Sequence, residues 1–336
     1  MKRTLASVIF SLLLVSALSL TAAQSVRVGI QNSTAVDIVA KQLGYAEEMV
    51  DAEIEYVSFD SGRDAILAVG SNSVDMVLVG SSPTAFGLSS GVEGEVAYVF
   101  HLIGEGESLV CSEASEATTL EDLAGKTLAV PFGSTTHYDM LQALESVGLG
   151  EGDVTLLDLQ PSDMVGAFER GDIDCGWVWY PALQNLYDAG GVKVTDAAQM
   201  AEMGFPTSDL LVVNKAYGEA NPETVAQYVA ALDRAVTLVD EDMAAAAQAM
   251  VDEFGMTAEE AETAMSQLIR LGADEQLSAE QLGSGEEKGG VSEALYSQAQ
   301  FLAEQGLTEQ ARDLQVYQDA VNPSYLELAQ ENGYIQ

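Results

Sequence analysis

The sequence predicts an α/β protein with two lobes. From residue 26 onward, short β-rich runs alternate with segments of helical spacing, and turns rich in glycine, serine or proline separate them. The chain has 336 residues, which at about 150 residues per domain favours two compact lobes over one large core. Forty-eight per cent of the residues are hydrophobic, so the chain has enough apolar material to fold.

The first run of elements extends to residue 106. Its predicted strands are short, apolar and rich in β-branched residues, and they cover residues 26–30, 54–59, 76–79 and 96–102. Helices are predicted between them at residues 36–43 and 63–70, where apolar side chains recur at helical spacing. Another helix follows the turn 80–83, because Pro83 suits a first helical turn.

The same order of strand, turn and helix recurs from residue 107. Strands are predicted at residues 109–111, 127–130, 154–159 and 175–179, with a return strand at 210–213. A helix follows the second of these strands and carries Tyr138, Leu141 and Leu144. Beyond residue 215, apolar side chains recur every three or four positions, which predicts an almost wholly helical remainder.

No linker rich in proline or glycine separates the two runs, so we expect hinge strands to join the lobes. Lobe 1 is predicted to comprise residues 24–106 together with 214–336, and lobe 2 is predicted to be the insertion 107–213. Because the chain then crosses twice between the lobes, we expect a ligand cleft between them.

Residues 1–23 are predicted to be a secretory signal peptide. Lys2 and Arg3 precede an apolar run, residues 6–20, which ends in small residues. That run, at about fifteen residues, is short for a membrane span. No cysteine lies near the cleavage position, so we expect a free periplasmic protein of a Gram-negative cell rather than a lipid-anchored one.

The charge is strongly negative. The chain has 13 basic and 53 acidic residues, a net charge of −40, which makes nucleic acid a poor partner. One interpretation is a saline habitat, in which salt screens the self-repulsion of an acidic surface; ordinary acidic drift is the other.

Catalytic and metal chemistry find little support in the sequence. The two histidines and two cysteines have no metal-ligand spacing, so no metal and no cofactor are expected. His101 ends an apolar strand and is expected in the core, and His137 has no nucleophile spaced with it. The sequence therefore favours a binding protein over an enzyme.

Two turns between a strand and a helix carry hydroxyl groups. One contains Ser81 and Ser82, and the other contains Ser134, Thr135, Thr136 and His137. Free N–H groups at a helix start attract anions, and in α/β folds ligands bind beyond the carboxyl ends of the strands. Each turn alone is also explained by ordinary helix capping, but one in each lobe favours a shared compact anion such as a sulfonate.

Two further candidates suit a cationic or apolar ligand end. Trp179 lies at the end of a strand with Trp177 on the same face, and it either faces a ligand or packs in the core. Asp209 precedes the return strand at the lobe boundary, where a carboxylate would pair with an ammonium group. Ordinary surface charge is the alternative for Asp209.

The sequence resembles the taurine-binding periplasmic proteins of ATP-driven importers, within the wider sulfonate and nitrate-type binding family. The resemblance rests on SFDSG (58–62), GSSP (80–83), VPFGSTTHY (130–138), LQP (159–161), FERGDID (168–174), VWYPA (178–182) and AQFLAEQG (299–306). It implies a type II periplasmic-binding-protein fold, a monomer that closes over an aminosulfonate and delivers it to an ABC permease and, through it, the transport ATPase.

The resemblance also implies residue roles. Gln31, Ser81, Ser82, Thr135, Thr136 and His137 match positions around the sulfonate, and Trp179 and Asp209 match those facing the ammonium group. In such a fold the strand after the first crossing lies beside the strand of Cys175, so a disulfide with Cys111 is favoured over two buried free cysteines. An alkanesulfonate, nitrate or a betaine is the alternative ligand, and a chemoreceptor role and an enzyme similar to thiamine-pyrimidine synthases remain open.

Overall fold

The structure is a computed structural model that describes residues 25–335. The predicted signal peptide, residues 1–23, therefore lies outside the described residues. Within the described part of the chain, no helix is both long enough and apolar enough to cross a membrane.

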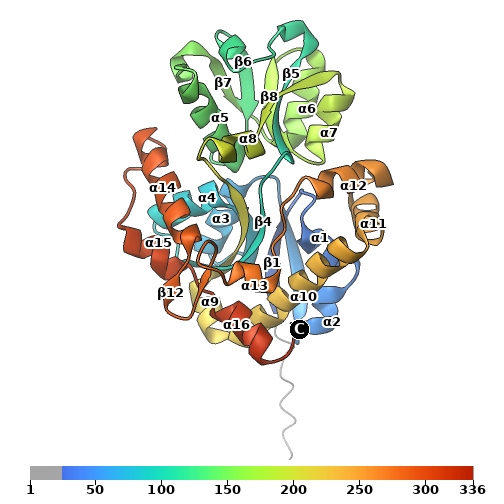
Figure 1. Cartoon of the computed structure of the whole chain (residues 1–336), viewed down its shortest axis with the longest axis vertical. Helices are drawn as coiled ribbons and strands as arrows, with labels where there is room; N and C mark the ends of the chain where they lie inside the picture. Colours follow the sequence, from blue (N-terminus) through green and yellow to red (C-terminus); the bar gives the residue numbers. More distant parts are fainter. Residues whose placement is uncertain (1–24, 336) are drawn as a thin grey trace, which may run out of the picture.

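Two mixed sheets of five strands each organise the chain, which confirms the predicted α/β class (Figure 1). The first sheet has the order β2 (Glu53–Phe59), β1 (Ser25–Gln31), β3 (Met76–Gly80), β10 (Ser208–Asn214) and β4 (Gly94–Leu102). The second has the order β7 (Thr155–Asp158), β6 (Thr127–Val130), β8 (Cys175–Trp179), β5 (Glu107–Ser112) and β9 (Gly191–Asp196). In each sheet the first three strands are parallel. The fourth strand, β10 or β5, runs antiparallel to both of its neighbours, so the last strand again has the direction of the first three.

Helices cover both sheets. Around the first sheet lie α1 (Val36–Gln42), α2 (Tyr45–Met49), α3 (Gly62–Gly70), α4 (Ser81–Ser89), α9 (Lys215–Ala220), α10 (Pro222–Glu241), α11 (Met243–Phe254), α12 (Ala258–Ser266), α13 (Ala273–Gln276), α14 (Gly290–Glu304), α15 (Leu314–Ala320) and α16 (Ser324–Glu331). Around the second lie α5 (Thr135–Ser146), α6 (Pro161–Arg170), α7 (Ala182–Asp188) and α8 (Ala197–Glu202). Single 3₁₀ turns occur at Glu113–Ser115, Glu121–Leu123 and Glu151–Asp153.

Most strands lie where the apolar runs predict them, and β9 is the clearest omission. This is a six-residue edge strand with a largely exposed first half, and its alternation of Val192, Lys193 and Val194 is too short to stand out in the sequence. The short hairpin of β11 (Gly283–Ser284) and β12 (Glu287–Lys288) falls in the glycine-rich patch that carried no strand signal.

The chain crosses between the sheets at two adjacent places. Strand β4 ends at Leu102 and β5 begins at Glu107, while the return crossing enters β10 at Ser208. The segment after α12 braces the first crossing, because the backbone of Leu102 exchanges hydrogen bonds of 2.9 and 3.1 Å with that of Ile269. A side chain at Gly104 would meet the carbonyl oxygen of Gln267 at 2.5 Å, so this close approach requires glycine.

A disulfide joins β5 and β8 inside the second sheet. Cys111 and Cys175 lie opposite one another in the strand register, and their sulfur atoms are bonded. Both are fully buried in the same apolar cluster as Leu109 and Trp177. The bond therefore links the first strand after the crossing to the centre of its sheet.

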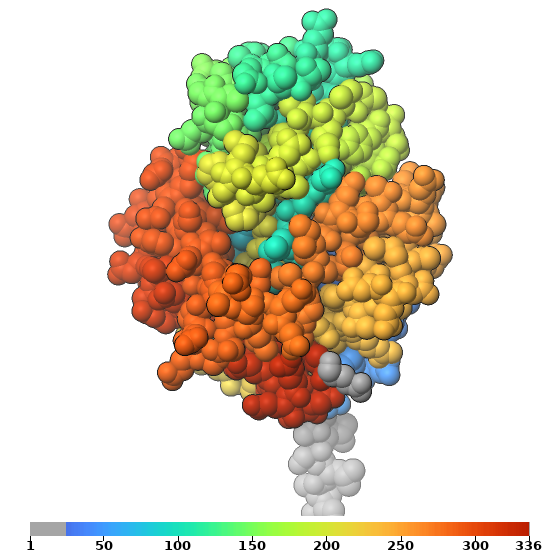
Figure 2. All heavy atoms as spheres, in the orientation of Figure 1, coloured from blue at the N-terminus to red at the C-terminus, as the bar shows by residue number. Residues whose placement is uncertain are grey.

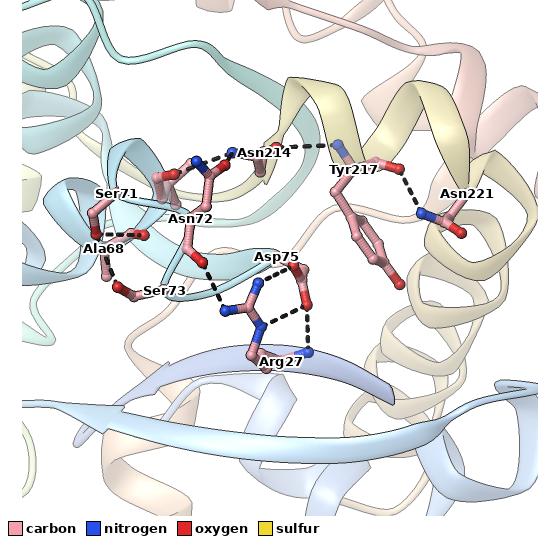
Figure 3. A network of polar contacts seen from close by, with 10 residues as sticks. Arg27, Ala68, Ser71, Asn72, Ser73, Asp75, Asn214, Tyr217 and Asn221 are labelled. Carbon is pink, nitrogen blue, oxygen red and sulfur yellow. Dashed lines mark hydrogen bonds and ion pairs between the residues drawn. The ribbon is translucent and has the colours of Figure 1, made fainter. Parts of the chain in front are cut away.

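A polar network holds the opposite end of the first sheet, at the amino ends of its parallel strands (Figure 3). The Arg27 guanidinium pairs with both carboxylate oxygens of Asp75 at 2.6 and 3.1 Å, and it donates to the carbonyl of Asn72 at 2.7 Å. The Asn214 amide donates to the Asn72 side chain, and its oxygen caps α9 by accepting from the backbone of Tyr217. The network lies away from the carboxyl ends of β1 and β3, where α/β folds bind ligands.

Candidate functional site

A cavity lies between the two lobes at the carboxyl ends of the strands. Its lining comes from both sides: Gln31, Ser33, Thr34, Ala35, Gly62, Gly80, Pro83, His101, Ile103, Asp209 and Leu268 from the first lobe, and Gly106, Glu107, Ser134, Thr135, Trp179 and Tyr180 from the crossing and the second. The cavity volume is about 30 Å³, so it suits a small ligand. Figure 2 shows the two lobes meeting along a seam, with yellow atoms of the upper lobe beside the orange atoms of C-terminal helices.

Four of the eight predicted ligand residues line this cavity. They are Gln31, Thr135, Trp179 and Asp209. Gln31 is the last residue of β1, and its amide donates to the carbonyl of Leu78 at 3.0 Å. Thr135 is the first residue of α5, and its hydroxyl lies 2.9 Å from both carboxylate oxygens of Glu107.

Ser81 and Ser82 lie at the start of α4 but turn away from the cavity. The Ser82 hydroxyl is buried and donates to Gln298 on α14 at 3.0 Å. The Ser81 hydroxyl accepts from the backbone N–H of Ser208 at 3.3 Å. The adjacent Gly80 and Pro83 line the cavity in their place, so this turn faces the cavity mainly through its backbone.

Thr136 and His137 also lie outside the cavity lining, and both stabilise the turn before α5. The Thr136 hydroxyl shares a hydrogen bond of 2.8 Å with Ser134. His137 Nδ1 accepts from the backbone N–H of Gly133 at 3.1 Å, and the ring stacks on Phe132 with centroids 4.5 Å apart. Burial lowers the pKa of His137 to about 4, so this ring is neutral near pH 7.

Ser134 belongs to the hydroxyl-bearing turn that the sequence predicts, and it lines the cavity although it is not among the eight predicted ligand residues. It is the N-cap of α5, and its hydroxyl oxygen accepts from the backbone N–H of His137 at 3.1 Å. This cap fixes the helix start at the cavity wall, where the first backbone N–H groups of a helix have no partner within it.

Asp209 is paired with His101. Oδ2 of Asp209 lies 3.1 Å from Nε2 of His101, and both residues line the cavity. The sequence predicts His101 in the core; its ring is buried, and it also forms part of the cavity wall.

Glu107 is the second carboxyl group of the cavity, and the sequence analysis missed it. It is the first residue of β5, directly after the crossing, and it is buried. Burial raises the pKa of Glu107 well above its usual value; the nearby charge of Asp209 adds to that rise, and the Thr135 hydroxyl opposes it. The sequence did offer one signal for this residue: Glu107 is an acidic residue at the start of a mainly apolar strand.

Two more buried carboxyl groups stand behind the cavity. Burial raises the pKa of Asp37 to about 7, with a smaller contribution from the charge of Asp209. Burial also raises the pKa of Asp139 well above its usual value, with Glu107 contributing. Among residues 25–335, no group of three or more histidine, cysteine, aspartate or glutamate residues is arranged to hold a metal ion.

The cavity thus combines two unlike kinds of group in a small space. The starts of α4 and α5 present unpaired backbone N–H groups, which suit an anion, whereas Asp209 and Glu107 suit a cationic group. Two α/β lobes around such a cavity form the architecture of periplasmic binding proteins. More particularly, the chain belongs to the NMT1-like family, whose model matches residues 22–252.

Comparison with known proteins confirms the resemblance drawn from the sequence. The chain is 40% identical to the taurine-binding periplasmic protein of Escherichia coli K12 over 174 residues, which cover 52% of this chain and 53% of that protein. It is 25% identical to a putative aliphatic sulfonates-binding protein of Bacillus subtilis 168 over 232 residues, 68% of this chain and 69% of that protein. The match thus spans about half the length of the Escherichia coli relative.

A solved structure shares the fold over nearly the whole chain. It is the alkanesulfonate-binding protein SsuA from Xanthomonas axonopodis pv. citri bound to MOPS, with a TM-score of 0.73 and 22% sequence identity. The superposition covers 90% of this chain and 99% of that one. At this identity the likeness concerns the fold alone, and it confirms the periplasmic-binding-protein architecture.

Proposed function

We propose that this chain is the periplasmic binding component of an ABC importer and that it captures taurine or a close aminosulfonate. One observation carries the proposal: Asp209 and Glu107, on strands of the two different sheets, line the same small cavity as the start of helix α5. A zwitterion with its anionic and cationic groups a few atoms apart can contact both the helix start and the two carboxyl groups.

The anionic end of the ligand would lie against the helix starts. The predicted sulfonate residues Gln31 and Thr135 line the cavity together with Gly80 and Ser134. Backbone N–H groups and neutral side-chain donors surround a tetrahedral anion without arginine, which fits a chain with only 13 basic residues. Ser81, Ser82, Thr136 and His137 would then act by shaping the two turns, and a direct contact with the sulfonate stays a prediction for them.

The cationic end of the ligand would lie between the carboxyl groups. Asp209 is held by His101, and burial raises the pKa of Glu107. An ammonium group between them favours the ionised form of both, so binding relieves the electrostatic cost of bringing the two acids together. The Trp179 ring supplies a further wall that suits a cation or an ethylene stem.

Capture and delivery would follow from the two-lobed architecture. We assign lobe 1 to residues 24–106 and 214–336 and lobe 2 to residues 107–213, with closure about the two crossings. The closed monomer would present the surface that an ABC permease recognises, and the transport ATPase would be coupled to the binding protein through that permease. The relatives named above support a periplasmic location and a binding role rather than an enzymatic one.

Alkanesulfonates are the competing ligand class, because two of the compared proteins are described as binders of such compounds. Calorimetric titration of residues 24–336 with taurine, ethanesulfonate, isethionate and glycine betaine separates the classes. We expect taurine to bind with about micromolar affinity, near 8 kcal/mol, and the sulfonates without an ammonium group to bind much more weakly.

The variant Asp209→Asn tests the cationic end, and Asp172→Asn is its matched control. Asp172 is an exposed acid paired with Arg170, so the control removes the same charge without touching the cavity. Asp209→Asn should weaken taurine and spare ethanesulfonate, while the control should match the wild type. If the wild type binds ethanesulfonate more tightly than taurine, the ligand class is the alkanesulfonates. If none of the four compounds binds, the proposed function is rejected.

A further inference from the structure

His101 and Asp209 face one another across the two strands that lead to the crossings. Strands β4 and β10 pair antiparallel, and the register sets Asp209 opposite His101. The register shifts immediately afterwards, between Asp209 and Leu210, where Phe100 is passed over in the pairing. Such bulges re-aim side chains next to functional sites, and this one turns both residues toward the cavity wall.

The side chains of His101 and Asp209 are largely shielded from water, so their polar atoms need partners within the protein. The side chains of His101 and Asp209 are 3% and 13% exposed, so water compensates their polarity poorly. The charge of Asp209 contributes to the raised pKa of both Glu107 and Asp37, which shows that three acids crowd this corner of the cavity. A hydrogen-bond donor that points at Asp209 therefore offsets the repulsion between its carboxylate and the carboxyl groups of Glu107 and Asp37.

The surroundings of Nδ1 indicate which nitrogen of the His101 ring carries the proton. Nδ1 is buried, and the described residues provide no hydrogen-bond partner for it. A neutral ring with its proton on Nε2 leaves only a weak acceptor unpaired, whereas a doubly protonated ring would bury an unpaired charged donor. The geometry thus favours a neutral ring that donates from Nε2 to Oδ2 of Asp209, 3.1 Å away.

We propose that His101 is a positioning residue that holds the Asp209 carboxylate toward the cavity and thereby selects ligands with an ammonium end. The inference rests on the proposed function and deepens it, because His101 acts through Asp209 on one end of the ligand only. His101 does not need to touch the ligand for this role.

The first test compares two ligands that share a sulfonate and differ in the ammonium group. Titration of His101→Ala should show an affinity for taurine about ten- to a hundredfold lower, the usual loss for a hydrogen bond to a charged group, while the affinity for ethanesulfonate stays unchanged. His101→Gln, which keeps a donor at the end of a similar reach, should restore most of the loss. In the Asp209→Asn background, His101→Ala should have no further effect on taurine.

The matched control is Tyr98→Phe. Tyr98 lies on the same strand β4, and its side chain is fully buried outside the cavity lining. The control therefore removes a buried polar atom outside the cavity lining and should bind both ligands as the wild type does. Equal weakening of taurine and ethanesulfonate by His101→Ala, or failure of His101→Gln to rescue, overturns the positioning role.

A second measurement needs no ligand and covers the case in which a variant folds poorly. The ¹⁵N chemical shifts of the His101 ring in the wild type should report a protonated Nε2 and an unprotonated Nδ1, and Asp209→Asn should change them. A ring protonated on Nδ1 overturns the inference. If the wild type binds none of the sulfonates, the proposed function fails, and the ring shifts still decide whether His101 and Asp209 are paired.

Discussion

The indole Nε1 of Trp179 donates a hydrogen bond to the backbone carbonyl of Asn32, 3.1 Å away. Trp179 ends β8 in the second sheet, and Asn32 follows β1 in the first, so this bond joins the two lobes beside the cavity. Two other contacts join the lobes at the sides: Arg63 lies 3.8 Å from Asp158, and the rings of Tyr138 and Phe301 meet edge to face at 5.2 Å. The two lobes are therefore in direct contact around the cavity.

Trp179→Phe should weaken closure. The substitution keeps an aromatic wall and removes the N–H donor, which costs about 1 kcal/mol, or about fivefold in affinity for taurine. Calorimetry measures the affinity, and small-angle scattering should show a larger radius of gyration for the variant. Trp177→Phe is the control, because its indole Nε1 lies buried in the second lobe without a hydrogen-bond partner among the described residues. Equal affinity losses in both variants would contradict a role for the bond to Asn32.

Asp37 should make stability depend on pH. Its pKa rises from 3.8 in the unfolded chain to about 7 in the folded one, chiefly by burial. The folded state then keeps a proton that the unfolded state loses, so the contribution of Asp37 is fully present below pH 4 and is lost as the pH rises to about 7. The loss amounts to about 4 kcal/mol, from 1.36 kcal/mol per pKa unit.

Asp37→Asn isolates this effect from the other buried acids. The amide resembles the neutral carboxyl group in size and carries no charge at any pH, so urea unfolding should show similar stability for both proteins at pH 4. At pH 8 the variant should be the more stable of the two. A constant difference between the two proteins from pH 4 to pH 8 would show that Asp37 does not titrate in this range.

The sequence predicts the fold well because burial leaves a strong signal. Strand β3 is buried throughout, and its residues form an uninterrupted apolar run. Strand β9 escaped detection because its alternating segment is short and lies exposed at the edge of the sheet, where burial adds no further apolar residues.

The site was predictable only in part, for geometric reasons. The residues at Thr135 and Asp209 follow from rules about strand ends and helix starts, which place them at the cleft. The rotation of α4 about its axis decides whether the hydroxyls of Ser81 and Ser82 face the cavity. The Ser82 hydroxyl donates to Gln298 on α14 rather than facing the cavity. Glu107 and His101 reach the cavity through strand register, which the sequence alone does not fix.

Loss of the disulfide should destabilise the protein. The bond between Cys111 and Cys175 closes a segment with a sequence separation of 64, so its removal should cost about 4 kcal/mol by the chain-entropy relation. Urea unfolding with and without reductant measures this, and mass spectrometry with thiol alkylation verifies the redox state. The variant carrying alanine at both positions should match the reduced protein and should not respond to reductant. Unaltered stability on full reduction would contradict the expectation.

Asp75→Asn should separate stability from binding. Asp75 accepts from the Arg27 guanidinium at 2.6 and 3.1 Å and from the Arg27 backbone at 2.8 Å, so loss of its charge weakens the tie between β1 and the turn before β3. Hydrogen bonds to charged groups contribute about 1.5–3 kcal/mol, and a loss in this range is expected in the free energy of unfolding.

The affinity for taurine should stay the same in Asp75→Asn, because the network lies at the amino ends of the parallel strands and the cavity lies at their carboxyl ends. Asp172→Asn again serves as the control, since its partner Arg170 is largely exposed and such pairs contribute little to stability. Weaker binding by Asp75→Asn at a temperature where the variant remains folded would mean that the two ends of the first sheet are coupled. Unchanged binding with reduced stability would establish that this network supports the sheet without tuning the cavity.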